Sequence, residues 1–218
     1  MGQNIVVPKR ALISVFYKDG LEEFIPGLFE RVPDIDILSS GGTANRIREI
    51  MGREDAVRDV SEYTGFPESP QGLVKTINPK ISGGQLLDFD LEDHREFAEA
   101  QGILPIDMVV CGLYPHAETI AKPGHTIEEA RHKIDIGGSL MTRACIKSYP
   151  RAFVLFNPGQ YPGCLDELDR NGGGTSFDYR VERAIEALDA HVKYDAGILK
   201  YLLTRNRDQM RRDHGIEP

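Results

Sequence analysis

The chain has 218 residues, 40% of them hydrophobic and 28% charged, a balance that is typical of a globular protein with a sizeable core. Its formal net charge of −8 argues against a protein that binds nucleic acid over a broad surface. The sequence has no apolar run long enough to span a bilayer and no basic-then-apolar segment at its start. The three cysteines, Cys111, Cys145 and Cys164, have no CxxC spacing, so we expect reduced thiols in a cytoplasmic protein, with neither a disulfide frame nor a zinc site.

Short apolar strands alternate with helical stretches along the chain. In chain order we expect a strand at 11–16, a helix at 21–31, a strand at 35–38, a helix at 44–51, a strand at 56–60, a helix at 91–101, a strand at 107–113, helices at 126–133 and 139–149, a strand at 152–156, a helix at 165–171, and a long amphipathic stretch, of one helix or two, at 179–205. Residues 61–85 are expected to be irregular, 171–176 to be a loop and 206–218 to be a frayed tail. The alternation predicts a single α/β domain over residues 1–218, with three layers: a mostly parallel sheet and helices on both of its faces.

A glycine turn at residues 39–44 (SSGGTA) joins the second strand to the second helix. Its two glycines permit a tight turn and a close approach of the backbone to a ligand, and Thr43 is a suitable N-cap residue. The free N–H groups and the positive dipole end of a helix start suit a phosphate. An ordinary capped turn has the same residue types, so the turn alone leaves both interpretations open.

Polar residues follow several of the predicted strands. Ser14 and Lys18 follow the first strand, Ser40 and Thr43 follow the second, and Tyr114 follows the strand at 107–113. Because ligands of open parallel sheets bind beyond the carboxyl ends of the strands, we expect these residues to converge on one site. Lys75 and Thr76 are added from the irregular stretch, since a long structureless segment in a compact domain is often functional.

A second glycine turn at residues 134–139 (IDIGGS) begins a helix that carries Arg143 and Lys147. These two residues are four apart and therefore share one helical face. With the Asp135 carboxylate at the mouth of the helix, the arrangement suits acid–base chemistry on an anionic substrate. For the basic pair alone, a capped helix with a solvated basic face is the favoured interpretation.

Seven motifs in order resemble one family. They are ALISV at 11–15 with Lys18 and Gly20, SGGTA at 40–44, VSEYTGFPE at 60–68, GLVKTINP at 72–79, GILPIDMVVCGLYP at 102–115, IDIGG at 134–138 and RACIKS at 143–148. Over residues 11–161, and more loosely in the C-terminal helices, the chain is similar to IMP cyclohydrolase, the N-terminal domain of the bifunctional AICAR transformylase/IMP cyclohydrolase. The resemblance implies a methylglyoxal-synthase-like fold, a homodimer, and a reaction that needs no metal and no cofactor.

The family reaction is the ring closure of FAICAR, a formylated purine precursor ribonucleotide, to IMP with loss of water. The resemblance assigns the central roles to Lys75, Tyr114, Asp135 and Lys147. Asp135 would take or orient the amide proton, and Lys147 with Tyr114 would stabilise the oxyanion or give a proton to the departing water. Lys75 would position the formamide and assist proton transfer. The order of the proton transfers stays open.

The resemblance also implies a phosphate cradle. The family positions that hold the 5-phosphate correspond to Ser14, Lys18, Ser40, Gly42, Thr43 and Thr76. Gly137, in the second glycine turn, joins the expected substrate-binding residues. This expectation agrees with the chemistry of the first glycine turn.

The chain departs from the family pattern at six positions: Tyr17 replaces Asp, Leu73 replaces Arg, Asn78 and Ser82 replace His, and Gly112 and Ser148 replace Asn. Leu73 and Gly112 cannot form side-chain hydrogen bonds, so contacts to the base or the sugar are lost. Either the substrate pose is altered, or other groups such as Tyr17, His116 and Arg143 compensate.

Two alternatives to the enzyme stay open. One is a catalytically weakened protein that binds a purine nucleotide as a sensor or an assembly subunit. The other, which the VKT, LYP and IDIGG motifs disfavour, is a methylglyoxal-synthase-like lyase acting on a phosphorylated triose. Because the sequence lacks a transformylase half, a cyclohydrolase is expected to receive FAICAR from a separate AICAR transformylase, by contact or by diffusion.

Overall fold

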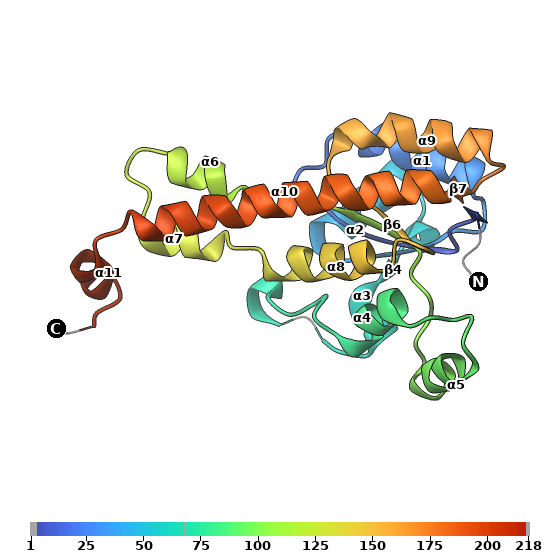
Figure 1. Cartoon of the computed structure of the whole chain (residues 1–218), viewed down its shortest axis with the longest axis horizontal. Helices are drawn as coiled ribbons and strands as arrows, with labels where there is room; N and C mark the ends of the chain where they lie inside the picture. Colours follow the sequence, from blue (N-terminus) through green and yellow to red (C-terminus); the bar gives the residue numbers. More distant parts are fainter. Residues whose placement is uncertain (1–3, 68, 217–218) are drawn as a thin grey trace.

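A five-stranded parallel sheet forms the centre of the protein in this computed structural model, which describes residues 4–67 and 69–216 (Figure 1). The spatial order of the strands is β4 (Arg58–Asp59), β3 (Asp36–Ser39), β2 (Arg10–Ser14), β5 (Met108–Cys111) and β6 (Phe153–Leu155). From β2 the chain moves outward through β3 to β4 and then crosses to β5 and β6 on the other side. The switch point, where ligands of such sheets bind, therefore lies between β2 and β5.

Helices cover both faces of the sheet. One face packs against α1 (Leu21–Arg31), α2 (Gly41–Met51) and α9 (Tyr161–Arg170). The other packs against α3 (Val60–Thr64), α4 (Pro79–Leu86), α8 (Ile136–Lys147) and α10 (Phe177–Leu203). Successive strand residues alternate between these two cores: Ile13 belongs to the first and Leu12 to the second. The three-layer α/β fold predicted from the sequence is confirmed.

The helix α10 runs along the length of the molecule and extends past the sheet (Figure 1). Around its far end lie α6 (His116–Ala121), α7 (Ile127–His132) and α11 (Arg207–Asp213). The remaining elements are α5 (Glu92–Gln101), a short antiparallel pair of β1 (Ile5–Val6) with β7 (Thr175–Ser176), and 3-10 turns at Glu54–Ala56, Pro70–Gly72 and Pro158–Gln160. No helix in the described ranges is both long enough and apolar enough to cross a membrane.

Both glycine turns enter their helices earlier than the sequence predicts. The helix α2 starts at Gly41 with Ser40 as its N-cap, and not after Thr43. Similarly, α8 starts at Ile136 with Asp135 as its N-cap, and not at Ser139. In the first turn of α8, close neighbours exclude larger residues at both glycines, whereas a Cβ on Gly42 in α2 would have no neighbour within 4 Å. A Cβ on Gly138 would lie 2.6 Å from the Asp135 Oδ2 atom.

Three segments are more ordered than expected. Residues 61–85 contain all but one residue of α3 and of α4, and Asn78 caps α4 by accepting a hydrogen bond from the Lys80 N–H at 2.9 Å. The expected loop at 171–176 ends in β7. The expected frayed tail contains α11, capped by Asn206, while residues 217 and 218 lie outside the described residues. In both helices a local N-cap, rather than a long apolar pattern, marks the start.

Candidate functional site

A cavity of about 530 Å³ lies at the carboxyl ends of β3, β2 and β5. It collects every expected site residue except Lys147: Ser14, Lys18, Ser40, Gly42, Thr43, Lys75, Thr76, Tyr114, Asp135 and Gly137. These residues come from five separate parts of the sequence: 14–18, 40–43, 75–76, 114 and 135–137. The cavity is where the strand order predicts a ligand site.

Lys147 does not line this cavity. It is the last residue of α8, whereas Asp135 caps the first turn, and its side chain is exposed. Twelve residues of α-helix separate the two positions, and a rise of 1.5 Å per residue places them about 18 Å apart along the axis. Lys147 was expected to act with Tyr114 on the oxyanion or the departing water, and within one chain it lies outside the cavity that Tyr114 lines. The expectation followed the motif and did not take the length of the helix into account.

The start of α2 presents free polar groups to the cavity. Ser40 is only 4% exposed, and its Oγ atom has no hydrogen-bond partner in the part of the chain that the structure describes. Gly41 has a φ of +53°, a left-handed conformation that favours glycine. The hydroxyl of Thr43 donates to the Val15 carbonyl at 3.1 Å and so ties the turn to the end of β2. The unpaired hydroxyl and the free N–H groups of the first turn suit an anion.

Two lysines converge on the same end of the cavity. The Lys18 ammonium donates to the carbonyls of Val15 and, at 3.0 Å, of Phe16. The Nζ atom of Lys75 lies 3.5 Å from where a Cβ on Gly41 would stand. Burial, and then the charge of Lys75, lower the pKa of Lys18. Within residues 4–67 and 69–216 neither lysine has a carboxylate within 4.0 Å, so a bound dianion would relieve their repulsion.

Asp135 is the buried carboxylate of the site, 9% exposed. Its Oδ1 accepts a hydrogen bond from the Gly138 N–H at 2.7 Å, and its Oδ2 accepts one from the Tyr114 N–H at 3.2 Å. Burial raises the pKa of this carboxyl. The hydrogen bonds from the two N–H groups, and then the charges of His191 and Lys75, lower the pKa by less than burial raises it. Its burial and raised pKa give the Asp135 carboxylate a higher affinity for a proton than an exposed aspartate has, as a general base requires.

Tyr114 supplies a hydroxyl to the opposite wall. Its side chain is 39% exposed, and its ring packs edge-on against Phe16 with centroids 5.5 Å apart. The Lys133 ammonium lies 5.5 Å from the centroid of the same ring. Burial, and then the charge of Asp135, raise the pKa of Tyr114, so its hydroxyl stays protonated at neutral pH and can donate.

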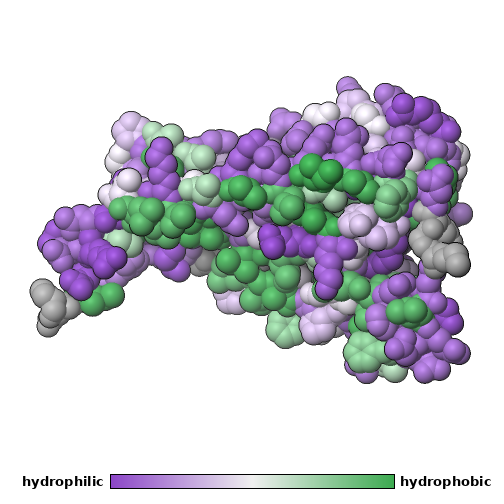
Figure 2. Space-filling view, in the orientation of Figure 1, coloured by the Kyte–Doolittle hydropathy of each residue, from purple (hydrophilic) through white to green (hydrophobic). Residues whose placement is uncertain are grey.

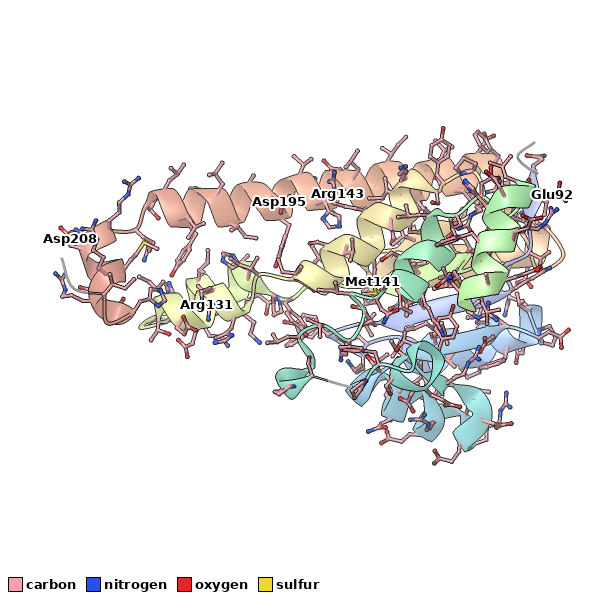
Figure 3. All side chains as sticks on the ribbon, turned by 90° about the horizontal axis from the view of Figure 1, so that it is seen from below. Glu92, Arg131, Met141, Arg143, Asp195 and Asp208 are labelled. Atoms are coloured by element: carbon pink, nitrogen blue, oxygen red, sulfur yellow. The ribbon has the colours of Figure 1, made fainter. Side chains whose placement is uncertain are left out.

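Several departures from the family pattern lie in the wall of the cavity. Leu73, 65% exposed, and Gly112 both line it. Of the residues expected to compensate, Tyr17 and His116 line a neighbouring cavity of about 450 Å³, and the Tyr17 hydroxyl donates to Glu118 at 2.6 Å. Arg143 is exposed on α8, where that helix runs beside α10 (Figure 3). None of the three compensates for Leu73 or Gly112 from within the nucleotide-sized cavity.

Among the lining residues that sequence reasoning missed are His132 and Met141. The His132 Nε2 atom lies 3.0 Å from Glu128 at the end of α7, and Met141 is on the inner face of α8 (Figure 3). For His132 the sequence offered a signal, because this histidine stands three residues before Asp135. Met141 offered none, because a buried methionine in a helix is ordinary core. No metal-binding group of three or more His, Cys, Asp or Glu side chains occurs in the described ranges.

Comparisons with known proteins agree with this geometry. The MGS-like domain family matches residues 20–140. The bifunctional purine biosynthesis protein PurH of Thermoanaerobacter sp. (strain X514) is 42% identical over 198 residues, which is 91% of this chain and 38% of PurH. The chain thus spans little more than a third of that relative. A solved structure described as the crystal structure of ForH has a TM-score of 0.75 and 27% identity, covering 87% of this chain and 94% of ForH.

The matched region contains β3, β4 and β5, both glycine turns and the residues between them. It therefore includes most of the cavity wall, and the relation to PurH extends beyond it over nearly the whole chain. The chain belongs to the MGS-like domain family and is a relative of the purine biosynthesis protein PurH.

Proposed function

We propose that this protein is an IMP cyclohydrolase, which closes the ring of FAICAR to give IMP and water. The observation that carries the proposal is one cavity holding Lys75, Tyr114 and Asp135 beside a phosphate-type helix start. The identity to PurH, whose name places it in purine biosynthesis, supports the substrate class. Such an enzyme is expected to work in the cytoplasm, on FAICAR that an AICAR transformylase supplies.

The 5′-phosphate would sit at the start of α2. The Ser40 hydroxyl and the free N–H groups there would donate to it, and Lys18 and Lys75 would balance its charge. With the phosphate fixed there, the heterocycle extends toward Tyr114 and Asp135. Thr76 and Gly137 both line the cavity, and a Cβ on Gly137 would lie 2.8 Å from the Thr76 hydroxyl oxygen.

The carboxamide nitrogen attacks the formyl carbon, and the new carbon–nitrogen bond closes the ring. Asp135 takes the nitrogen proton, since its carboxylate is buried and its pKa is raised. The formyl oxygen gains negative charge as the bond forms, and the Tyr114 hydroxyl stabilises it. That oxygen then takes protons and leaves as water, so the atoms of FAICAR equal those of IMP and water.

A second function is favoured by one observation. Leu73 and Gly112 stand in the cavity wall where the family pattern has hydrogen-bonding residues, and a nucleotide could bind there in an unproductive pose. The protein would then be a purine-nucleotide sensor or assembly subunit. Binding of IMP without turnover of FAICAR distinguishes this function from the enzyme.

We also propose that the protein is a homodimer. An apolar stripe on α10 is exposed along the helix (Figure 2), and its members are 43–75% exposed: Ile185, Leu188, Val192, Leu199, Leu202 and Leu203. Their spacing of three, four and seven residues keeps them on one helical face. A second copy of the chain that packs its own stripe here would bury both.

Turnover tests the proposed function directly. Purified protein mixed with FAICAR is expected to form IMP, and the change in ultraviolet absorbance on ring closure measures the rate. EDTA is expected to leave that rate unchanged. A rate that vanishes with EDTA and returns with zinc or magnesium contradicts the metal-free reaction. IMP binding in the absence of any turnover supports the sensor instead.

The pH dependence of turnover should report Asp135. Because the reaction needs the ionised carboxylate, kcat is expected to fall as the pH decreases through a pKa that lies above the ordinary aspartate value of about 3.9. Asp135→Asn should lose about 100- to 10,000-fold in kcat at neutral pH, the usual contribution of a general base. A variant with near-normal kcat and an unchanged acid limb would remove Asp135 from the mechanism.

Lys18 is expected to act mainly in binding. Lys18→Ala should weaken IMP binding by about 1.5–3 kcal/mol, the size of a charge-assisted hydrogen bond, as measured by calorimetric titration. Lys122→Ala, an exposed lysine beyond the end of α6, is the matched control and should bind like the wild type. An unchanged dissociation constant for Lys18→Ala would show that the phosphate does not bind at Lys18.

The apolar stripe gives a test of the dimer. Val192→Asp places a charge in the middle of the stripe, and sedimentation equilibrium should then detect monomers where the wild type is dimeric. Lys193→Asp, one residue along the same helix, is the control. A wild-type chain that is monomeric at high protein concentration overturns the proposal.

A further inference from the structure

Tyr194 of α10 joins the ends of two helices that are distant from it in sequence. Its hydroxyl accepts a hydrogen bond from the Asp135 N–H at 2.9 Å and donates one to the Lys133 carbonyl at 2.8 Å. Lys133 is the C-cap of α7 and Asp135 is the N-cap of α8. One oxygen atom of α10 thus holds the backbone of the segment that carries the carboxylate.

The two residues that Tyr194 contacts, Lys133 and Asp135, have side chains that lie in or beside the proposed reaction site. The Asp135 backbone sets where its carboxylate stands against the N–H groups of Gly138 and Tyr114. The Lys133 side chain lies over the rings of Phe16 and Tyr114, 5.2 and 5.5 Å from their centroids. A shift of this segment would therefore move both the carboxylate and the cation that lies against the Tyr114 ring.

We propose that Tyr194 is a positioning residue for Asp135, and that through it α10 sets the geometry of the ring-closing site. The kinetic consequences of this inference rest on the proposed cyclohydrolase function. Tyr194 itself lines the neighbouring cavity and not the one that holds the phosphate-type turn, so it is placed to act through Asp135. Misplacing a reacting group by about 1 Å can lower a rate about 100-fold.

The groups around Asp135 determine how removal of the Tyr194 hydroxyl would change the pKa of the Asp135 carboxyl. The titratable groups that face it come from the loop before α4, from β5 and the residues after it, and from α10: Lys75, Cys111, Tyr114, His191 and Tyr194. His191 is fully buried, and burial lowers its pKa, so it is neutral near pH 7. The two N–H bonds are then the main stabilisers of the ionised carboxylate, and loosening them raises its pKa.

The chain offers a closely matched control on the same helix. The rings of Tyr194 and Tyr201 both pack edge-on against the His116 ring, with centroids 6.3 and 5.5 Å away. The Tyr201 hydroxyl, in contrast, is buried and has no hydrogen-bond partner in the ranges described. Tyr194→Phe and Tyr201→Phe each remove one oxygen from α10, and only the first breaks the contact with Asp135.

Steady-state kinetics with FAICAR test the proposal. Tyr194→Phe should lower kcat about 10- to 100-fold, keep KM within about threefold because the phosphate contacts are untouched, and move the acid limb of kcat to higher pH. Tyr201→Phe should stay within about twofold in both constants. Equal effects of the two variants, or a Tyr194→Phe enzyme with normal kcat and an unmoved acid limb, overturn the proposal.

A second measurement separates this inference from the proposed function. Carbon-13 titration of the Asp135 carboxyl needs no turnover, and it should give a higher pKa in Tyr194→Phe than in the wild type and no change in Tyr201→Phe. If the wild type does not convert FAICAR, the cyclohydrolase proposal fails, and the titration still decides whether Tyr194 positions the carboxylate. If Tyr194→Phe does not fold, 3,5-difluorotyrosine at position 194 keeps the ring and weakens the oxygen as an acceptor. An unchanged Asp135 titration in that protein overturns the inference.

Discussion

The site depends on how closely the first turn of α8 approaches the end of β5. The Asp135 carboxylate bridges them, because one oxygen caps its own helix and the other accepts the N–H of Tyr114. Only glycine permits the approach: a Cβ on Gly138 would lie 2.6 Å from the Asp135 carboxylate, and one on Gly137 would lie 2.8 Å from the Thr76 hydroxyl. The same small residues that shape the turn therefore make room for the buried carboxylate.

At the other end of the cavity, two positive charges lie close together. Lys18 and Lys75 approach each other closely enough to affect the pKa of Lys18, and the buried Ser40 hydroxyl has no hydrogen-bond partner among the residues that the structure describes. Unpaired buried polar groups and uncompensated like charges destabilise a folded chain. An anion bound at the proposed phosphate site would satisfy both.

Much of this arrangement could be predicted from residue patterns. The alternating strands and helices predicted the three layers, and the ends of the strands predicted which polar residues would meet, because both follow from local periodicity and sheet topology. Helix starts were placed three residues late, since a glycine in a first helical turn is indistinguishable from a loop glycine without its neighbours. Lys147 was misplaced for a different reason: its motif matched, but its distance along α8 was not considered.

The role of Tyr194 could not be predicted at all. In the sequence it is one aromatic residue on an amphipathic helix, and its two partners lie 59 and 61 residues earlier. Only the packing of α10 across the junction of α7 and α8 brings them together. Long-range hydrogen bonds from a side chain to the backbone leave no periodic signature.

The continuity of α10 has a mechanical consequence. The helix runs unbroken from Phe177 to Leu203, a length of about 40 Å. It carries the solvent-facing apolar stripe on one side and the oxygen that holds Asp135 on another. No loop separates the stripe from that oxygen. A partner bound on the stripe would therefore act on the same continuous helix that holds the Asp135 backbone.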